Sequence, residues 1–310
     1  MSTPKRHHWI PQMFIASWSS CGSNRGSIMQ MDRQCSEIRG IKVRDAGVTK
    51  NLYKIDSGLA PAPVGPAIVE ESFQLIESAA APVLRKIISG HNPPAPDSEE
   101  YQNLCGFLAS LVMRVPSRLQ WFDELLRRPV ETAIRRLHVN GELLRAGAMS
   151  AEELVGMLDR GEVEIKINKN AQLGFMLHST YPLRSILMAR TWSVLRSRSD
   201  AGELVFGDSP VILTWTDRRP GVDSPGFGLQ NTAVFVPVGP TCALLGLWDK
   251  VPRDLRLSAQ QVAFWNSESI SQASRFIFFR DTFSAMHCSG VIDDVATVLR
   301  RWSERTTPTS

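Results

Sequence analysis

Residues 5–18 read Lys5-Arg6-His7-His8-Trp9-Ile10-Pro11-Gln12 and then Met13-Phe14-Ile15-Ala16-Ser17-Trp18. Chain termini usually fray unless side chains tie them down. Three aromatic side chains of this stretch, Trp9, Phe14 and Trp18, each gain roughly 1.5–3 kcal/mol or more when buried. We therefore expect the stretch to be docked between the helices and a sheet near residues 206–245, with its polar head lining a site.

Length and composition predict an ordinary globular protein. The 310 residues are 43% hydrophobic and 21% charged, which argues against disorder. We expect a single compact domain over residues 1–305, with a helical part at about 67–197, a sheet-plus-helix part at about 203–302 and a tail at 306–310. No apolar run reaches the roughly 18–20 residues that cross a bilayer, and the N-terminus lacks the apolar core of a secretory signal, so we expect no membrane partner.

The cysteines and the arginines bear on compartment and partners. The five cysteines are odd in number and scattered, with no Cys-x-x-Cys pair, which indicates reduced thiols in the cytoplasm. The net charge is +4, and 27 of the 35 basic residues are arginine. Arginine grips phosphate in a bidentate way, which suits nucleic acid, but a GC-rich genome gives the same bias without a functional reason.

Hydrophobic periodicity predicts a hairpin followed by helices. Alternation favours strands at 27–32 and 37–43, and apolar spacing of three and four residues favours a helix over 67–88. Asp97, with Glu100 three residues on, is typical of a helix N-cap. The helix that begins there is expected to continue to Val115 and to be kinked by Pro116. Further helices are expected over 118–144, interrupted at Pro129, and over 171–196, broken near Pro182.

The last third has a different pattern. Short β-rich runs are expected as strands at 203–206, 211–215, 233–236 and 242–246. Ser258 opens a capping box for a helix that extends to about residue 279, and a final helix covers 293–302. The predicted fold class is α+β, mostly helical, with a small, mainly antiparallel sheet in the C-terminal third and a short N-terminal hairpin.

His7 and His8 are the first candidates for chemistry. Adjacent side chains point in different directions, so that one can face a site while the other braces it. Neutral imidazole is a common metal ligand and general base. The alternative is a surface pair that helps Lys5 and Arg6 to bind phosphate.

Glu70 and Glu77 lie on one flank of the predicted 67–88 helix, two turns or about 11 Å apart. They can frame a site, or they can form a solvated flank. Arg114 borders the apolar face of the next helix, where it either pairs with one of these glutamates or clamps an anion.

Asp208 and Asn266 complete the candidates. Asp208 precedes Ser209-Pro210, a turn in which the carboxylate bonds backbone amides, although the mouth of a sheet also suits a catalytic or metal-binding carboxylate. Asn266 falls inside an apolar stripe, where a buried amide needs partners.

The sequence contains no G-x-x-x-x-G-K-[ST], G-x-G-x-x-G, G-x-S-x-G or H-E-x-x-H motif, and the downstream Asn and His of an HNH nuclease are missing.

These pieces, in this order, resemble a family of bacterial and fungal proteins, domain of unknown function 4238. The resemblance covers about residues 5–280 and rests on the following segments: the opening His7-His8-Trp9-Ile10-Pro11-Gln12, Asn51-Leu52-Tyr53, the helix with Val69-Glu70 and Ile76-Glu77, Arg114-Val115-Pro116, Gly207-Asp208-Ser209-Pro210, Val236-Pro237 and Asn266. Gly207 stands where the family usually has serine.

The resemblance implies a role but no agreed activity. Family members occur in phage-defence neighbourhoods of bacterial genomes, which implies an effector that acts on nucleic acid or nucleotides. It also implies that the family's polar signature positions converge in space: His8, Gln12, Glu77, Arg114 and Asp208.

Two functional hypotheses follow. In the first, the chain is a phosphodiesterase or nuclease with His7, His8, Gln12, Glu77 and Asp208 as catalytic residues; Mg²⁺ or Mn²⁺ is the expected metal, with His8, Glu77 and Asp208 as its candidate ligands. Substrate would be held by Arg114, Lys5, Arg6 and Asn266. In the second, the chain is a non-catalytic sensor or binding module and the His-His-x-x-Pro segment is a structural lock. Either way, a ring nitrogen of His7 or His8 should lie within hydrogen-bond or one-water reach of Glu70, Glu77, Arg114 or Asp208.

Overall fold

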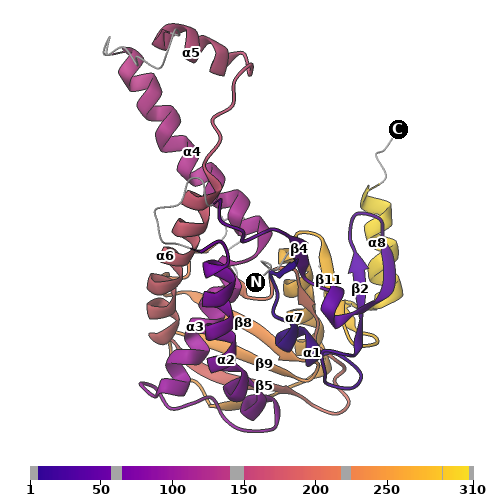
Figure 1. The fold of residues 1–310 in the computed structure, drawn as a ribbon. Helices are drawn as coiled ribbons and strands as arrows, with labels where there is room; N and C mark the ends of the chain where they lie inside the picture. The colour runs from indigo at the N-terminus through magenta and orange to yellow at the C-terminus, as the bar shows by residue number, and fades with distance from the viewer. Residues whose placement is uncertain (1–5, 57–64, 140–149, 218–224, 288, 307–310) are drawn as a thin grey trace.

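The computed structural model describes residues 6–56, 65–139, 150–217, 225–287 and 289–306 (Figure 1). Its largest sheet has five strands. Their order is β10-β5-β9-β8-β7. The strands are β5 Thr191–Ser197, β7 Ile212–Trp215, β8 Thr232–Gly239, β9 Cys242–Leu247 and β10 Asp254–Leu257. The β10–β5 pair is parallel and the other pairs are antiparallel, so this sheet is mixed.

A second sheet joins the two ends of the chain. Its order is β3-β2-β11-β6, with β2 Ser27–Asp32, β3 Glu37–Lys42, β6 Phe206–Gly207 and β11 Phe276–Phe279, all antiparallel. Two smaller pairs are β1 Arg6–His8 with β4 Val48–Lys50, and β12 Ser284–Met286 with β13 Ile292–Asp294. The predicted N-terminal hairpin is confirmed, and it is extended by a strand from the far end of the chain.

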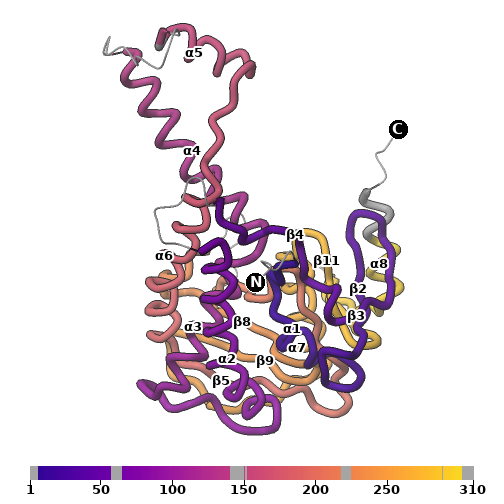
Figure 2. Tube along the Cα trace, viewed as in Figure 1, coloured from indigo at the N-terminus to yellow at the C-terminus, as the bar shows by residue number. Residues whose placement is uncertain are grey.

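Helices surround these sheets, which confirms the α+β class. In the described ranges they are α1 Gln12–Ala16, α2 Ile68–Ile88, α3 Glu99–Met113, α4 Pro116–Val139, α5 Ala151–Asp159, α6 Lys169–Met188, α7 Ala259–Gln272 and α8 Val295–Thr306, with the 3₁₀ turn η1 Val43–Asp45. The far half of α4 and the whole of α5 project from the body as an arm (Figure 2). Throughout the described part of the chain, every helix is too short or too polar to cross a bilayer.

Alternation along the strands divides the large sheet into two buried faces. Val234 and Val236 of β8 belong to the core that contains α2 and α3, whereas Phe235 between them packs with α7. The Phe235 and Trp265 rings stack at 4.2 Å between centroids. Because successive side chains of a strand point to opposite faces, the sheet separates two helical layers.

The N-terminal stretch packs against both helix and sheet. Trp9, Phe14 and Trp18 are 5%, 2% and 0% exposed, which confirms the burial expected for them. The Phe14 ring lies 6.3 Å from Phe107 of α3 and 5.6 Å from Phe206 of β6. The Trp18 indole N–H donates to the carbonyl of Leu204 at 3.3 Å. These contacts tie residues 9–18 to segments remote in sequence.

Two predicted helical stretches are strands, and several short strands, β10 among them, were not predicted. The helix expected over 171–196 ends at Met188, and Thr191–Ser197 is the buried strand β5. The helix expected to reach 279 ends at Gln272, before strand β11. The four residues of β11 are all apolar, and periodicity does not separate such a run from a helix. Strand β5 mixes polar and apolar residues without the strict alternation that indicates a strand. Strand β10 was not predicted because its alternation of polar and apolar residues covers only four positions.

Helix boundaries needed smaller corrections. Asp97 has φ +68°, and Ser98, with extended backbone, is the actual N-cap, accepting from the Tyr101 N–H at 3.1 Å. Pro116 separates two helices rather than kinking one. Pro129 and Pro182 lie inside continuous helices. Pro129 is exposed, so water can satisfy the carbonyl that loses its helical partner there. The capping box at Ser258 is confirmed.

Candidate functional site

Arg114 is the centre of the polar cluster at the N-terminus. It follows the last residue of α3 and is 1% exposed. Its guanidinium donates to Oε1 of Glu77 at 2.7 Å and to the main-chain carbonyl of His8, and it lies 4.4 Å from the centre of the Phe73 ring. The predicted pairing of Arg114 with a glutamate is confirmed.

His7 and Tyr53 complete this cluster. The Tyr53 main-chain N–H donates to Nδ1 of His7 at 2.7 Å, and the two rings stack at 5.6 Å. The Tyr53 hydroxyl donates to the carbonyl of Arg114 at 2.5 Å. Because Nδ1 of His7 accepts a hydrogen bond, it carries no proton, so His7 braces the backbone. We call His7, His8, Tyr53, Glu77 and Arg114 the lock.

The His8 ring points to a different set of groups. Its Nε2 lies 3.0 Å from the carbonyl oxygen of Arg44 and 3.2 Å from the amide nitrogen of Gln12. Burial lowers the pKa of His8, and the charges of Arg6 and Arg114 add to this, against the Arg44 hydrogen bond and the charge of Glu77. The hydrogen bond between His8 and Arg114 is made by the carbonyl, not the ring. Reach of either ring to a carboxylate through one water stays a prediction.

Glu70 differs from Glu77 in its hydrogen bonding. Within the described residues, its Oε2 and the Nε of Arg114 are buried without a hydrogen-bond partner. Burial raises the pKa of the Glu70 carboxyl, the charge of Arg114 opposes this, and the charge of Glu77 reinforces it. Arg114 therefore has one bonded carboxylate and a second one nearby that is poorly solvated.

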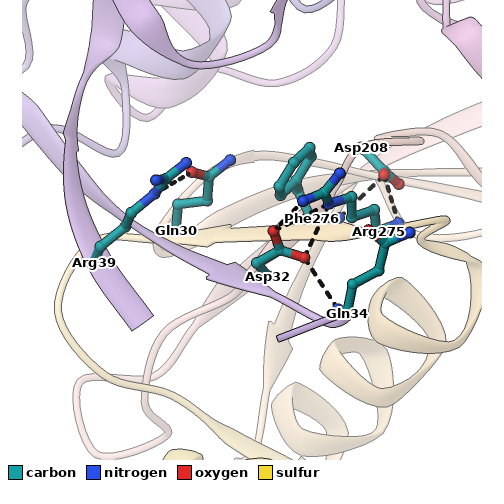
Figure 3. A network of polar contacts seen from close by, with 7 residues as sticks. All are labelled: Gln30, Asp32, Gln34, Arg39, Asp208, Arg275 and Phe276. Atoms are coloured by element: carbon teal, nitrogen blue, oxygen red, sulfur yellow. Dashed lines mark hydrogen bonds and ion pairs between the residues drawn. The ribbon is translucent and has the colours of Figure 1, made fainter. Parts of the chain in front are cut away.

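Asp208 fastens a different part of the fold. Its carboxylate accepts from the main-chain N–H group of Ser274 at 2.6 Å. It also accepts from the main-chain N–H groups of Arg275 at 2.6 Å and of Phe276 at 3.0 Å (Figure 3). Burial raises the pKa of Asp208 in spite of these three bonds, each of which acts to lower it. The turn interpretation was correct in kind, but the amides come from the start of β11 and not from the local turn.

The remaining predicted residues have separate positions. Asn266 is 0% exposed; its Oδ1 accepts from the Val205 N–H at 2.9 Å and its amide donates to the carbonyls of Glu203 and Ser284, both at 2.8 Å. Its predicted burial with backbone partners is confirmed. Arg6 is exposed and pairs with Asp45 at 2.6 Å. Lys5 lies outside the described residues.

The candidate metal ligands do not form a metal site. Glu77 is bonded to Arg114 and Asp208 to three main-chain N–H groups, and Nε2 of His8 lies within hydrogen-bond distance of the Arg44 carbonyl and the Gln12 amide. Across the described ranges, no group of three or more His, Cys, Asp or Glu side chains is arranged to hold a metal ion. These residues do not fit Mg²⁺ or Mn²⁺ in this arrangement.

A cleft of about 500 Å³ lies where three of the signature segments meet. Trp9, Pro116 and Asp208 each come from one of them and line it. Its polar lining includes side chains of β2, β3 and α4 and of the residue before β11: Gln30, Arg39, Gln120 and Arg275. We call this hollow the cleft. It lies beside the lock, because Trp9 follows His8 and Pro116 follows Arg114 by two residues.

The two arginines of the cleft differ in their partners. Arg275 is bidentate on the carboxylate of Asp32, with distances of 2.6–3.0 Å, whereas Arg39 donates to the neutral Oε1 of Gln30 at 3.2 Å (Figure 3). Arg39 is exposed, and among the described residues no carboxylate forms an ion pair with it. Arg39 is therefore a guanidinium on the cleft wall without a carboxylate partner among the described residues, while the two carboxylates that also line the cleft are bonded elsewhere, Asp45 to Arg6 and Asp208 to main-chain N–H groups.

Sequence reasoning missed Gln30, Arg39 and Arg275. One local signal existed, because Gln30 is a polar residue on the buried part of the 27–32 strand, directly opposite Arg39 in the hairpin register. Arg275 carried no such signal, since its place depends on the pairing of β11 with β2.

The lock should contribute more to stability than an exposed ion pair. Arg114→Met leaves the Glu77 carboxylate and the His8 carbonyl without their donor, so we expect a loss of about 2–4 kcal/mol in the free energy of unfolding. Urea denaturation measures it. The control is Lys86→Met, which breaks the exposed Lys86–Glu100 pair and should cost less than about 1 kcal/mol. Equal losses in the two variants would contradict the lock.

Glu70 should make stability depend on pH. A carboxyl with a higher pKa in the folded state binds its proton more tightly there, so its contribution is favourable below its ordinary pKa of 4.5 and is lost as pH rises through the folded-state value. Glu70→Gln should therefore raise the free energy of unfolding at neutral pH, and this gain should disappear below pH 4.5. Denaturation at both pH values measures it, with the exposed neighbour Glu71→Gln as control. A loss of stability at neutral pH would show that the Arg114 charge outweighs burial.

Comparison with known proteins identifies the family. A family model described as "Protein of unknown function (DUF4238)" matches residues 6–283. Comparison with curated proteins and with solved structures gives no match. The matched range contains the lock, the cleft and Asn266. The chain belongs to the DUF4238 family.

Proposed function

We propose that the chain binds a nucleotide, free or at the end of a nucleic acid, in the cleft, while the lock is a structural element that holds one wall of it. The observation that carries this proposal is that Arg39 lines the cleft and has no ion-pair partner among the described residues. A guanidinium without a carboxylate partner is suited to a phosphate group, which it contacts with two parallel hydrogen bonds.

The other walls suit a base and sugar. A volume of about 500 Å³ falls in the usual range for small-molecule sites, roughly 300–1,000 Å³. The Arg275 guanidinium lies 4.7 Å from the centre of the Phe276 ring, and flat groups of this kind stack on bases. The amides of Gln30 and Gln120 can bond the edge of a base. A phosphate at Arg39 and a base between these groups together account for the composition of the cleft.

A second candidate is hydrolysis of a phosphodiester or nucleotide bond. The observation that favours it is Asp208, a carboxylate on the cleft wall whose pKa is raised by burial, as a general base requires. The role in phage defence implied by the family resemblance belongs to this proposal, with the chain as an effector on nucleic acid or nucleotides.

Binding is tested by calorimetry with purine and pyrimidine nucleotides and the matching uncharged nucleosides. We expect nucleotides to bind at least about tenfold more tightly than nucleosides, because only they carry the phosphate that Arg39 contacts. Arg39→Gln should remove this difference. Arg25→Gln, which neutralises an exposed arginine outside the cleft lining, should not. Equal affinity for nucleosides, or equal effects of the two substitutions, would overturn the proposal.

Hydrolysis is tested by incubating the protein with DNA, RNA and nucleotides, with and without Mg²⁺ or Mn²⁺. Asp208→Asn should lower any cleavage, and a null result on all substrates with the wild type would end this candidate.

The variant His8→Ala distinguishes a structural role of His8 in the lock from a catalytic role. If His8 is structural, the substitution should lower the melting temperature by several degrees, which corresponds to a loss of about 1–2 kcal/mol in the free energy of unfolding. If His8 is catalytic, the variant should instead lose cleavage, and lose protection of cells in a phage-plaque assay, at unchanged stability.

A further inference from the structure

A second hollow of about 230 Å³ lies at the beginning of α4, on another side of the same motif segments. Its apolar walls include Val112, Val115 and Val211, and its polar lining consists of Ser117, Arg118 and Ser209. The segments after Arg114 and after Asp208 thus meet here as well. We call this hollow the α4 pocket.

Among the residues that the structure describes, the polar groups of the α4 pocket form no ion pair or side-chain hydrogen bond. Among the described residues, Arg118 forms no ion pair or side-chain hydrogen bond; the ring contact recorded for it is with Trp121, 5.3 Å from the ring centre. Within the same ranges, the hydroxyls of Ser117 and Ser209 form no hydrogen bond. Three polar side chains therefore line one small hollow with their bonding capacity unused.

Arg118 differs in this from Arg190, a buried arginine that follows α6. Arg190 donates to the carbonyls of Thr232 at 2.8 Å and Phe227 at 2.7 Å. Arg118 is partly buried, and that burial lowers its pKa with no neighbouring charge that opposes the effect. A cation that is removed from water without a counter-charge is costly, and an anion bound from solution would offset this cost.

We propose that the α4 pocket binds a small organic carboxylate, with its two oxygens on Arg118, further hydrogen bonds from Ser117 and Ser209, and its apolar body against the valines. One guanidinium matches one negative charge, whereas a phosphate dianion would bring a second charge into a largely apolar hollow. The volume admits a short aliphatic chain or a single ring. This site is separate from the proposed nucleotide site, although Ser117 lines both hollows.

Calorimetry and saturation-transfer NMR with acetate, hexanoate and phenylacetate test the proposal. We expect hexanoate or phenylacetate to bind at least about tenfold more tightly than the neutral amide of the same shape, because only the acid bonds the guanidinium as an ion. Arg118→Gln should abolish this preference. Arg128→Gln, an exposed arginine on the same helix, should leave it unchanged, and Ser209→Ala should weaken binding of the acid.

The comparison of acid with amide uses the wild-type protein, so it decides the matter even if Arg118→Gln fails to fold. Equal binding of acid and amide, or no binding of any of the three acids, would overturn the proposal. Inorganic phosphate that binds as tightly as hexanoate and depends equally on Arg118 would overturn the assignment of the ligand as a carboxylate.

Discussion

The structure depends on the burial of one arginine. Arg114 is 1% exposed at the end of α3, and its charge is offset by Glu77 of α2 and by the carbonyl of His8 in β1. Removing a guanidinium from water is unfavourable unless its donors are bonded and its charge is matched. The two partners belong to different elements, so satisfying Arg114 fixes α2, α3 and the N-terminal strand relative to one another.

The lock also sets the position of the hollows beside it. Trp9 follows the bonded carbonyl directly, and Pro116 follows Arg114 by two residues, so both reach the cleft from fixed points. Asp208 performs the corresponding task on the opposite wall, because its three hydrogen bonds hold the start of β11, where Arg275 lies. The signature residues thus mainly bond backbone and each other, whereas Arg39 and Arg118, which the signature does not include, have no ion-pair partner among the described residues.

The sequence allowed prediction of local elements and of some polar partners. The 27–32 hairpin, α2, the capping box at Ser258 and the Arg114–glutamate pair followed from periodicity, caps and flank positions. Strand β11 did not follow, because Phe276–Phe279 is a four-residue apolar run whose state is decided by partners in β2 and β6. The cleft could not be predicted for the same reason: Arg275 comes near Arg39 only through that non-local pairing.

The central claim is that the N-terminal segment is held by the lock as firmly as the core. Native-state hydrogen exchange at the Tyr53 amide, which donates to His7, tests it most directly. The lock predicts that this amide exchanges only through global opening, with the same free energy and denaturant dependence as the amide of Val236 in the centre of β8. Exchange of the Tyr53 amide by local fraying, several kcal/mol below the Val236 value, would contradict it.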